Sequence, residues 1–222
     1  MKYGIITLTH DSSLYNFFDN IKRKYLQKRG ILHTFVYNSN NIQSTQNPSD
    51  IMYHSNLIGD CGIYTMLDKF IMTLNVLKNN SDWNNCDHIL RANSSTFLNI
   101  PILEKHIEQL PKTNCYAGAI IRNEFISGTC IIFSKDVIQQ LSQISTKHEH
   151  IQTEDDLLIS NYMKKFQIPV INIPMYWYDK NIIPSKEEIS KVLQQYPLIR
   201  VRNLDRLNVD TKIWELIEKY YE

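Results

Sequence analysis

The pattern that most restricts the fold lies in the first 37 residues. Residues 3–9 are short, apolar and β-branched, as in a buried strand, and residues 10–13 supply polar groups for a loop and a helix cap. Apolar residues then recur at helical spacing over residues 14–25, and Gly30 ends this helix before a strand-like run over residues 32–37. Parallel strands need such a crossover connection. The sequence therefore predicts a β-α-β unit and an α/β fold.

The same alternation continues along the chain. Helices are predicted over residues 62–78, 101–110, 135–141, 157–166 and 213–221, and strands over residues 88–91, 116–121, 129–133 and 170–173. The polar residues 38–49 are predicted to form a loop and not a domain boundary. With 222 residues and 43% hydrophobic composition, the chain is predicted to be a single domain over residues 1–222.

Composition argues against several function classes. The chain has 24 Lys and Arg against 23 Asp and Glu, so its net charge is close to zero. A nucleic-acid partner is therefore not expected, because such proteins usually carry an excess of basic residues. No apolar run approaches the roughly 20 residues that span a bilayer, so we predict no transmembrane segment. The chain begins with a strand-like run and not with a signal peptide, so a cytoplasmic location is expected.

The cysteines do not indicate a zinc site or a redox motif. Cys61, Cys86, Cys115 and Cys130 are widely spaced and form no CxxC pair. We therefore expect reduced, mostly buried thiols. The chain also lacks a glycine-rich phosphate loop, a nucleophile elbow and an HExxH motif.

An ordered series of segments resembles a known enzyme family. The segments are Asp87–Ile100, Tyr116–Gly118, Ile126–Thr129, Phe133–Lys135 and Glu154–Ile159. In order and spacing they resemble the galactosyltransferase and Fringe group of glycosyltransferases, over roughly residues 60–175. The resemblance implies a GT-A-like fold, with a mixed, mainly parallel sheet flanked by helices. It also implies a nucleotide-sugar donor, a glycan or other hydroxyl acceptor, and an inverting displacement.

One position departs from the family pattern. Where the family carries an Asp-x-Asp pair that holds a divalent cation against the donor diphosphate, this chain has Asn93-Ser94-Ser95. Neutral amides and hydroxyls are poor ligands for Mg²⁺ or Mn²⁺. The sequence therefore disfavours a divalent metal cofactor and identifies no metal ligand. Asn93 and Ser95 either form hydrogen bonds with a ribose or sugar hydroxyl, or simply form a turn.

Without a metal, cations must neutralise the departing diphosphate, because stabilising the charge on a leaving group is usually a large catalytic effect. The candidates are Lys69, Arg91, Arg200 and Arg202. Arg200 and Arg202 alternate, so on an extended strand they share one face, and the guanidinium fork suits phosphate. The alternative is that these are ordinary solvated charges.

The acidic turn is the candidate catalytic centre. By the resemblance, Asp156 aligns with the family's general base and Asp155 with the acidic residue before it. Transfer to a hydroxyl requires a group that accepts its proton, which a positioned carboxylate can do. Carboxylates at a helix start are also selected for capping and for the helix dipole, and Glu154 is expected to serve only that purpose.

The remaining candidate contacts follow from position and resemblance. Thr9 and Asp11 follow the first strand, where parallel sheets gather ligands, so both are candidate donor contacts. Ser127 and Gly128 are candidate acceptor contacts by the resemblance. Trp177 lies in an aromatic run that forms either an acceptor platform or a core cluster.

Two rival functions stay open. The first is a catalytically inactive GT-A-like domain that binds a nucleotide, a glycan or a protein, which the neutral turn favours. The second is a Rossmann-type methyltransferase, which the missing glycine-rich loop after Thr9 disfavours.

Overall fold

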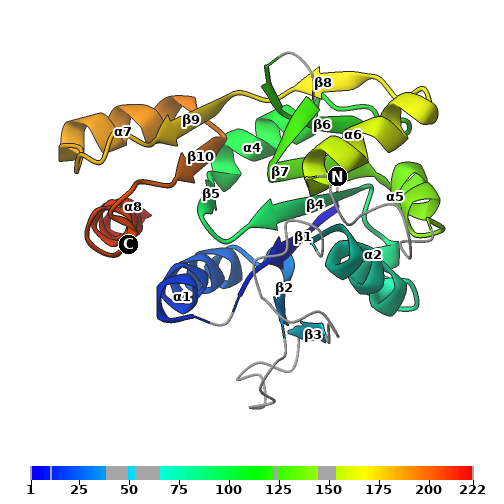
Figure 1. Ribbon diagram of the computed structural model, residues 1–222, viewed down its shortest axis with the longest axis horizontal. Helices are drawn as coiled ribbons and strands as arrows, with labels where there is room; N and C mark the ends of the chain where they lie inside the picture. The colour runs from blue at the N-terminus through cyan, green and yellow to red at the C-terminus, as the bar shows by residue number, and fades with distance from the viewer. Residues whose placement is uncertain are drawn as a thin grey trace.

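The computed structural model of the protein describes residues 2–10, 12–38, 50–53, 66–122, 125–144 and 154–221 (Figure 1). Asp11, a predicted donor contact, and Cys61 lie outside these residues. Cys86, Cys115 and Cys130 are buried and form no disulfide, as expected.

A seven-stranded sheet forms the centre of the molecule. In spatial order its strands are β3 (Ile51–Tyr53), β2 (Leu32–Asn38), β1 (Tyr3–Leu8), β4 (His88–Asn93), β7 (Phe125–Ser134), β6 (Tyr116–Ile121) and β8 (Val170–Asn172). In this sheet β7 pairs antiparallel with β4 and with β6, and the other described strand pairs are parallel. The predicted mixed, mainly parallel sheet is confirmed.

The N-terminal β-α-β unit forms as predicted. Helix α1 (Ser13–Lys28) is capped by Ser12, whose hydroxyl accepts a hydrogen bond from the Tyr15 backbone N–H at 3.4 Å. It ends near Gly30, which has a positive φ of 64° that favours glycine. Strand β2 then returns parallel to β1, with Gly4 opposite Leu32.

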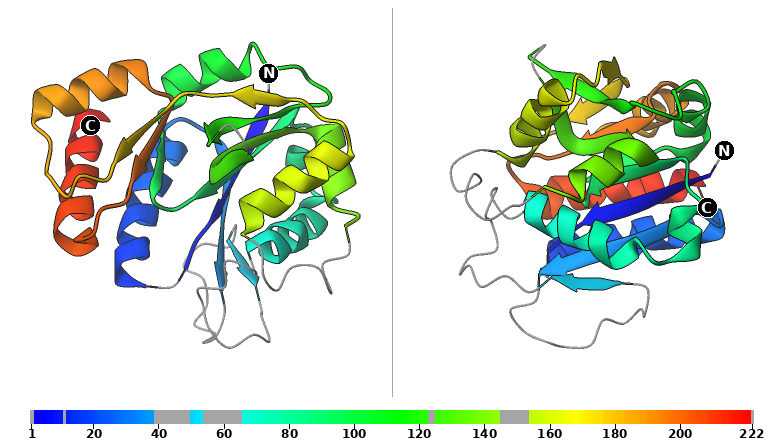
Figure 2. Two further views of the ribbon diagram at one scale, coloured as in Figure 1. Left: turned by 45° about the horizontal axis from the view of Figure 1, so that its top comes forward. Right: turned by 90° about the vertical axis from the view of Figure 1, so that its right-hand side faces the viewer.

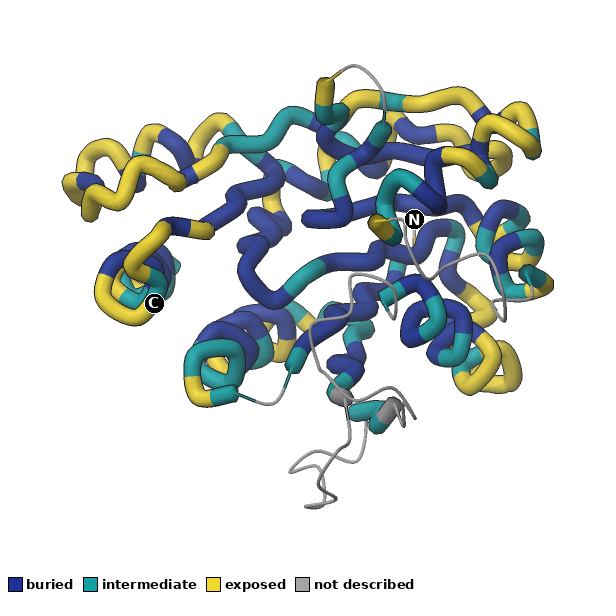
Figure 3. Tube along the Cα trace, viewed as in Figure 1, coloured by how far each residue is buried: buried dark blue, intermediate teal, exposed yellow. Residues whose placement is uncertain are grey.

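Helices cover both faces of this sheet (Figures 1 and 2). One apolar core lies under α2 (Met66–Leu77), α3 (Ser81–Asn84), α5 (Lys135–Leu141) and α6 (Asp155–Lys165). The other lies under α1, α4 (Ile100–Ile107), α7 (Lys186–Gln195) and α8 (Thr211–Tyr221). Neighbouring side chains of β1 point to opposite faces, so Ile5 enters the second core and Ile6 the first. The central strands are accordingly buried (Figure 3). No helix among the described residues has the length and apolar character to cross a membrane.

A second, three-stranded sheet brings the C-terminal segment to the middle of the chain. Its strands are β5 (Thr96–Leu98), β10 (Leu198–Val201) and β9 (Met175–Tyr178), with β10 in the centre. Arg200 pairs with Thr96, and the Val201 backbone donates to the Ser95 carbonyl at 3.0 Å. Strand β10 is therefore hydrogen-bonded to the turn that follows β4.

Two strands next to the pocket differ in length from the sequence expectation. The strand predicted over residues 88–91 runs through Asn93 as β4, and β5 starts at Thr96, which leaves Ser94-Ser95 as the turn. The reason is pairing: Ala92 lies opposite Thr7 and Cys130, and Asn93 opposite Leu8. Strand β7 is likewise longer than predicted because it pairs with both β4 and β6.

Trp214 offers a test of this packing. Its side chain is 0% exposed, stacks on Phe18 of α1 at 5.2 Å and meets Phe97 of β5 edge-on at 5.7 Å. We expect Trp214→Ala to lower the free energy of unfolding by about 3–5 kcal/mol, because a large buried side chain leaves a cavity. Urea denaturation followed by circular dichroism measures this.

The matched control is Trp177→Ala, since Trp177 is 44% exposed. It should cost less than about 1 kcal/mol. Equal losses for the two variants would contradict the packing of α8 against α1 and β5.

Candidate functional site

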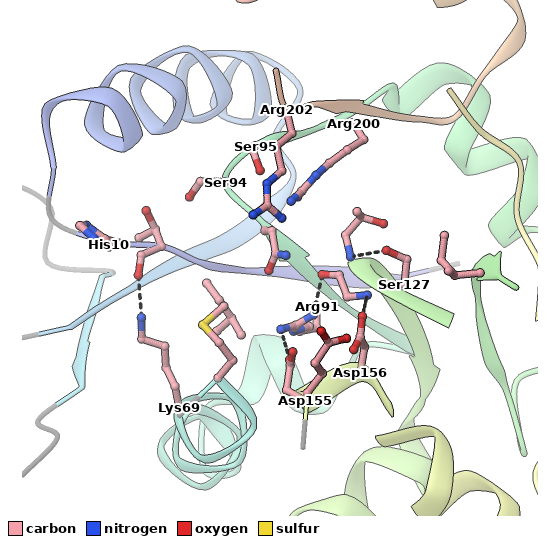
Figure 4. A pocket seen from close by; sticks show the side chains of 18 of the residues that line it. His10, Lys69, Arg91, Ser94, Ser95, Ser127, Asp155, Asp156, Arg200 and Arg202 are labelled. Atoms are coloured by element: carbon pink, nitrogen blue, oxygen red, sulfur yellow. Dashed lines mark hydrogen bonds and ion pairs between the residues drawn. The ribbon is translucent and has the colours of Figure 1, made fainter. Parts of the chain in front are cut away.

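A pocket of about 590 Å³ lies beyond the carboxyl ends of β1 and β4 (Figure 4). Open α/β sheets bind ligands at this edge. Every predicted site residue that the structure describes lines this pocket: Asp155 and Asp156; Thr9, Lys69, Arg91, Asn93, Ser95, Arg200 and Arg202; and Ser127, Gly128 and Trp177. The predicted catalytic, donor and acceptor residues therefore share one site.

The acidic turn contributes a carboxylate that is held in place. Helix α6 begins at Asp155, and Glu154 occupies the cap position without a capping bond from its side chain. The Asp156 Oδ2 atom accepts a hydrogen bond from the Gly128 backbone N–H at 2.9 Å, and its Oδ1 accepts from the Leu157 N–H at 3.0 Å. One bond is local to the helix start and the other reaches the pocket wall. Capping of α6 therefore explains only the bond from Leu157 to Asp156, and not the bond from Gly128.

Arg91 joins three elements beneath the pocket. The side chain of this β4 residue is 1% exposed and forms an ion pair with Asp155 of α6. Its Nη1 also donates to the Gly128 carbonyl oxygen of β7 at 2.5 Å. Burial raises the pKa of the Asp155 carboxyl, and the guanidinium opposes that shift. Arg91 and Asp155 thus compensate each other's buried charge.

Gly128 leaves the space in which this arrangement fits. A Cβ atom built on Gly128 would lie 2.6 Å from Arg91 Nη1 and 3.4 Å from Asp156 Oδ2. Real Cβ atoms essentially never lie as close as 2.6 Å to another heavy atom, so a side chain here would displace the Arg91 guanidinium. Gly128 was predicted as an acceptor contact, and its close approach to Arg91 is a second reason for glycine at this position.

The four predicted cations differ in their environments. Lys69 is buried, and its Nζ donates to the Thr9 carbonyl at 2.6 Å, while the Thr9 hydroxyl donates to Asp19. Arg91 is paired, as described above. Arg200 and Arg202 have no ion-pair partner among the described residues.

Arg200 lies deep in the wall and Arg202 at its edge. Arg200 is 7% exposed, and its Nη1 lies 3.4 Å from the Thr96 hydroxyl, whereas Arg202 is exposed. Their guanidinium groups lie side by side across the pocket from Asp155 and Asp156 (Figure 4). Burial, together with the charge of Arg202, lowers the pKa of Arg200 to about 10, so Arg200 remains a cation at neutral pH.

A buried pair on α1, Asp19 and Lys22, was missed by the sequence analysis. Lys22 is 1% exposed, and its Nζ donates to the Asn93 carbonyl at 2.9 Å, directly behind the turn. Burial lowers the pKa of Lys22 to about 8, and Asp19 opposes that shift. Their burial could have been predicted from their position, since both residues lie next to Phe18 and Ile21 on the apolar face of the predicted helix.

The side chains at the turn do not fit a hard divalent cation. The turn offers amide and hydroxyl oxygens, Asp155 is paired with Arg91, and both Asp156 oxygens already accept backbone hydrogen bonds. Across the described ranges, His, Cys, Asp and Glu form no group of three or more that could hold a metal. Lys22 and Arg200 lie next to the turn and repel cations, while the Asp19 carboxyl, which lies near Ser94, stabilises the Lys22 charge.

The chain resembles solved glycosyltransferase structures. Its sequence matches no protein-family model and no curated protein. A glycosyltransferase involved in the glycosylation of the major capsid of PBCV-1 matches with a TM-score of 0.58 and 10% identity, over 96% of this chain and 98% of that chain. The galactosyltransferase LgtC, solved with donor and acceptor sugar analogues, matches with a TM-score of 0.52 and 7% identity, over 98% of this chain and 95% of that chain. At these identities the likeness establishes the fold, and the chain has the GT-A-like fold of these glycosyltransferases.

Proposed function

We propose that this protein is a glycosyltransferase that moves a sugar from a nucleotide-sugar donor to a hydroxyl group of a glycan or other acceptor. The observation that carries the proposal is that, in this GT-A-like fold, acidic and basic side chains lie on opposite walls of the pocket. A fixed carboxylate, Asp156, lies on one wall, and Arg200 and Arg202, which have no carboxylate partner among the residues that the structure describes, lie on the other. Group transfer from a diphosphate to a hydroxyl requires both, a base for the proton and positive charge for the leaving group.

In the proposed reaction Asp156 is the general base. The acceptor oxygen forms a bond to the anomeric carbon as the bond from that carbon to the diphosphate breaks, and the acceptor proton passes to Asp156. The nucleoside diphosphate leaves with the bonding electron pair. A single displacement of this kind inverts the anomeric configuration. Each Asp156 oxygen uses one lone pair for a backbone N–H, which leaves another to accept the proton.

The donor and acceptor are assigned to opposite ends of the pocket. Thr9, Asn93 and Ser95 lie at the sheet edge, where we place the nucleotide, with Lys69 below Thr9. Ser127 and Gly128 lie toward the acidic turn, where we place the acceptor. The half-exposed ring of Trp177 lines the same pocket from β9, where Trp177 pairs with Arg200 of β10. An aromatic face offers the apolar surface on which a sugar ring packs.

We assign Arg91 and Asp155 positioning roles. The Arg91 guanidinium has both ends bonded, to Asp155 and to the Gly128 carbonyl, so its bonds favour holding the acidic turn over direct contact with the donor. Asp155 compensates this charge, and Asp156 is thereby held next to Gly128.

A binding module is the second candidate function. The neutral Asn93-Ser94-Ser95 turn favours a domain that holds a nucleotide or glycan without turnover, and in the described part of the chain His, Cys, Asp and Glu form no group of three or more that could hold a metal. Release of nucleoside diphosphate from a nucleotide sugar by the purified protein separates this candidate from the transferase.

The general-base role predicts the behaviour of Asp156→Asn. With the donor identified from a panel of nucleotide sugars, we expect turnover to fall at least about 100-fold, because the amide cannot accept the proton. The donor dissociation constant, measured by calorimetry, should change by less than about 3-fold, since the substitution spares the cationic wall.

Asp136→Asn is the matched control, because Asp136 lies in the first turn of α5 and accepts a hydrogen bond from the Asn114 N–H at 2.9 Å. It should leave turnover unchanged. Normal turnover by Asp156→Asn with donor binding intact would exclude Asp156 as the base.

The positioning role of Arg91 predicts a strong coupling with Asp155. Arg91→Gln alone leaves a buried carboxylate unpaired and should cost about 3–5 kcal/mol of unfolding free energy. The double variant Arg91→Gln/Asp155→Asn should recover at least about 1 kcal/mol relative to the sum of the single variants. Urea denaturation of all four proteins gives this coupling energy.

The surface pair Lys112 and Asp87, with side chains 66% and 29% exposed, provides the control cycle. Its coupling should be below about 1 kcal/mol. A coupling for Arg91 and Asp155 no larger than this value would argue against a buried, mutually compensating pair.

A further inference from the structure

We propose that Arg200 and Arg202 bind the donor diphosphate directly, without a bridging divalent cation. The inference rests on the proposed function and specifies how that pocket holds its substrate. The candidate anion site lies between the Asn93-Ser94-Ser95 turn and β10.

The first argument is the position of β10. Arg200 lies opposite Thr96 in the strand register, and the next residue, Val201, donates its backbone N–H to the Ser95 carbonyl at 3.0 Å. Side chains two residues apart lie on one face of an extended segment, so Arg200 of β10 and Arg202, the residue that follows this strand, both extend into the pocket (Figure 4). The turn with neutral side chains thus has a basic strand bonded to it.

The second argument is the uncompensated charge of Arg200. Arg23 and Arg206 are more exposed, yet each has a carboxylate partner, Asp50 at 2.8 Å and Asp210 at 3.0 Å. Arg200 is 7% exposed, has no carboxylate partner in the described part of the chain, and its buried Nε has no hydrogen-bond acceptor there. Burying an unpaired charge is costly, so an anion is the ligand that this environment favours.

The third argument is the charge behind the turn. Lys22 Nζ lies 2.9 Å from the Asn93 carbonyl and is close enough to Arg200 for each charge to affect the other. The Asp19 carboxyl compensates part of the Lys22 charge, so a cation in the same space would be repelled mainly by Arg200. A diphosphate would instead be attracted, and the planar guanidinium fork can engage two phosphate oxygens at once.

The fourth argument concerns the remaining polar groups of the turn. The Asn93 Oδ1 atom is buried and has no hydrogen-bond donor among the described residues. A ribose or sugar hydroxyl can supply that donor. The turn therefore has an unused acceptor for the sugar part of the ligand, next to guanidinium groups for its phosphates.

Isothermal titration with inorganic pyrophosphate, and with uridine and guanosine diphosphates, tests the inference in EDTA and again with Mn²⁺. We expect pyrophosphate and at least one nucleotide to bind in EDTA. Mn²⁺ should tighten the nucleotide dissociation constant by less than about 3-fold, because the turn supplies no carboxylate to the metal. Binding that occurs only with Mn²⁺, or no binding in either buffer, would overturn the inference.

Arginine substitutions identify the binding groups. Arg200→Gln should weaken pyrophosphate binding in EDTA at least about 10-fold, and Arg202→Gln should weaken it less, because the exposed side chain is solvated and screened. Arg29→Gln removes the same charge outside the pocket, where Arg29 lies over the Tyr25 ring, and should leave affinity unchanged. If Arg200→Gln does not fold, Arg200→Lys retains the charge without the fork and should bind with intermediate affinity. Wild-type affinity in the folded variants at both positions would overturn the inference.

The two proposals fail in different ways. Pyrophosphate binding in EDTA without turnover of any nucleotide sugar would support this anion site and oppose the transferase. Turnover that strictly requires Mn²⁺ would support the transferase and overturn the metal-free site.

Discussion

The geometry of the pocket depends on the compensation of one buried charge, that of Arg91. Its guanidinium is enclosed between β4, β7 and α6, and a charge in that position is tolerated only with a partner. Asp155 supplies that partner at the first residue of α6, which fixes where the helix begins relative to the sheet. Gly128 provides the space for the guanidinium, and its backbone N–H binds Asp156. The position of the proposed base thus follows from an ion pair that need not touch substrate.

The wall formed by Arg200 and Arg202 differs from the wall of Arg91 in that the charge of its buried arginine has no carboxylate partner among the described residues. Arg200 is nearly as buried as Arg91, but the described chain supplies it with no carboxylate, so its charge is available to a ligand. The acidic end of the pocket therefore has the Asp156 carboxylate beside a compensated Arg91–Asp155 pair, and the basic end has the charges of Arg200 and Arg202. This asymmetry matches the charge that develops in a transfer from a diphosphate, where a proton moves to one side and negative charge accumulates on the other.

Local signals predicted part of the fold and long-range contacts determined the rest. The β1-α1-β2 unit, α4 with its early Pro101 and α5 followed from apolar periodicity and cap residues. The three-stranded sheet did not, because β5 and β10 are short and pair across about 100 residues. Helix α7 was missed although its capping box, Ser185 with Glu188, is visible in the sequence. The pocket residues were found from strand ends and family resemblance, whereas the role of Lys22 depends on a contact with Asn93, which no local pattern reveals.

The neutral turn and the basic strand are consistent parts of one arrangement. Carboxylates at Asn93 and Ser95 would lie beside Arg200 and in front of Lys22, because β10 is bonded to the turn and Lys22 to the Asn93 carbonyl. Opposite unit charges 4 Å apart at an effective dielectric of 20 attract by about 4 kcal/mol. Acidic residues there would neutralise the two cations and leave little charge for a phosphate, with or without a metal between them. The amide and hydroxyl side chains of the turn keep Arg200 available, so the departure from the Asp-x-Asp pattern fits a pocket that binds its anion through arginine.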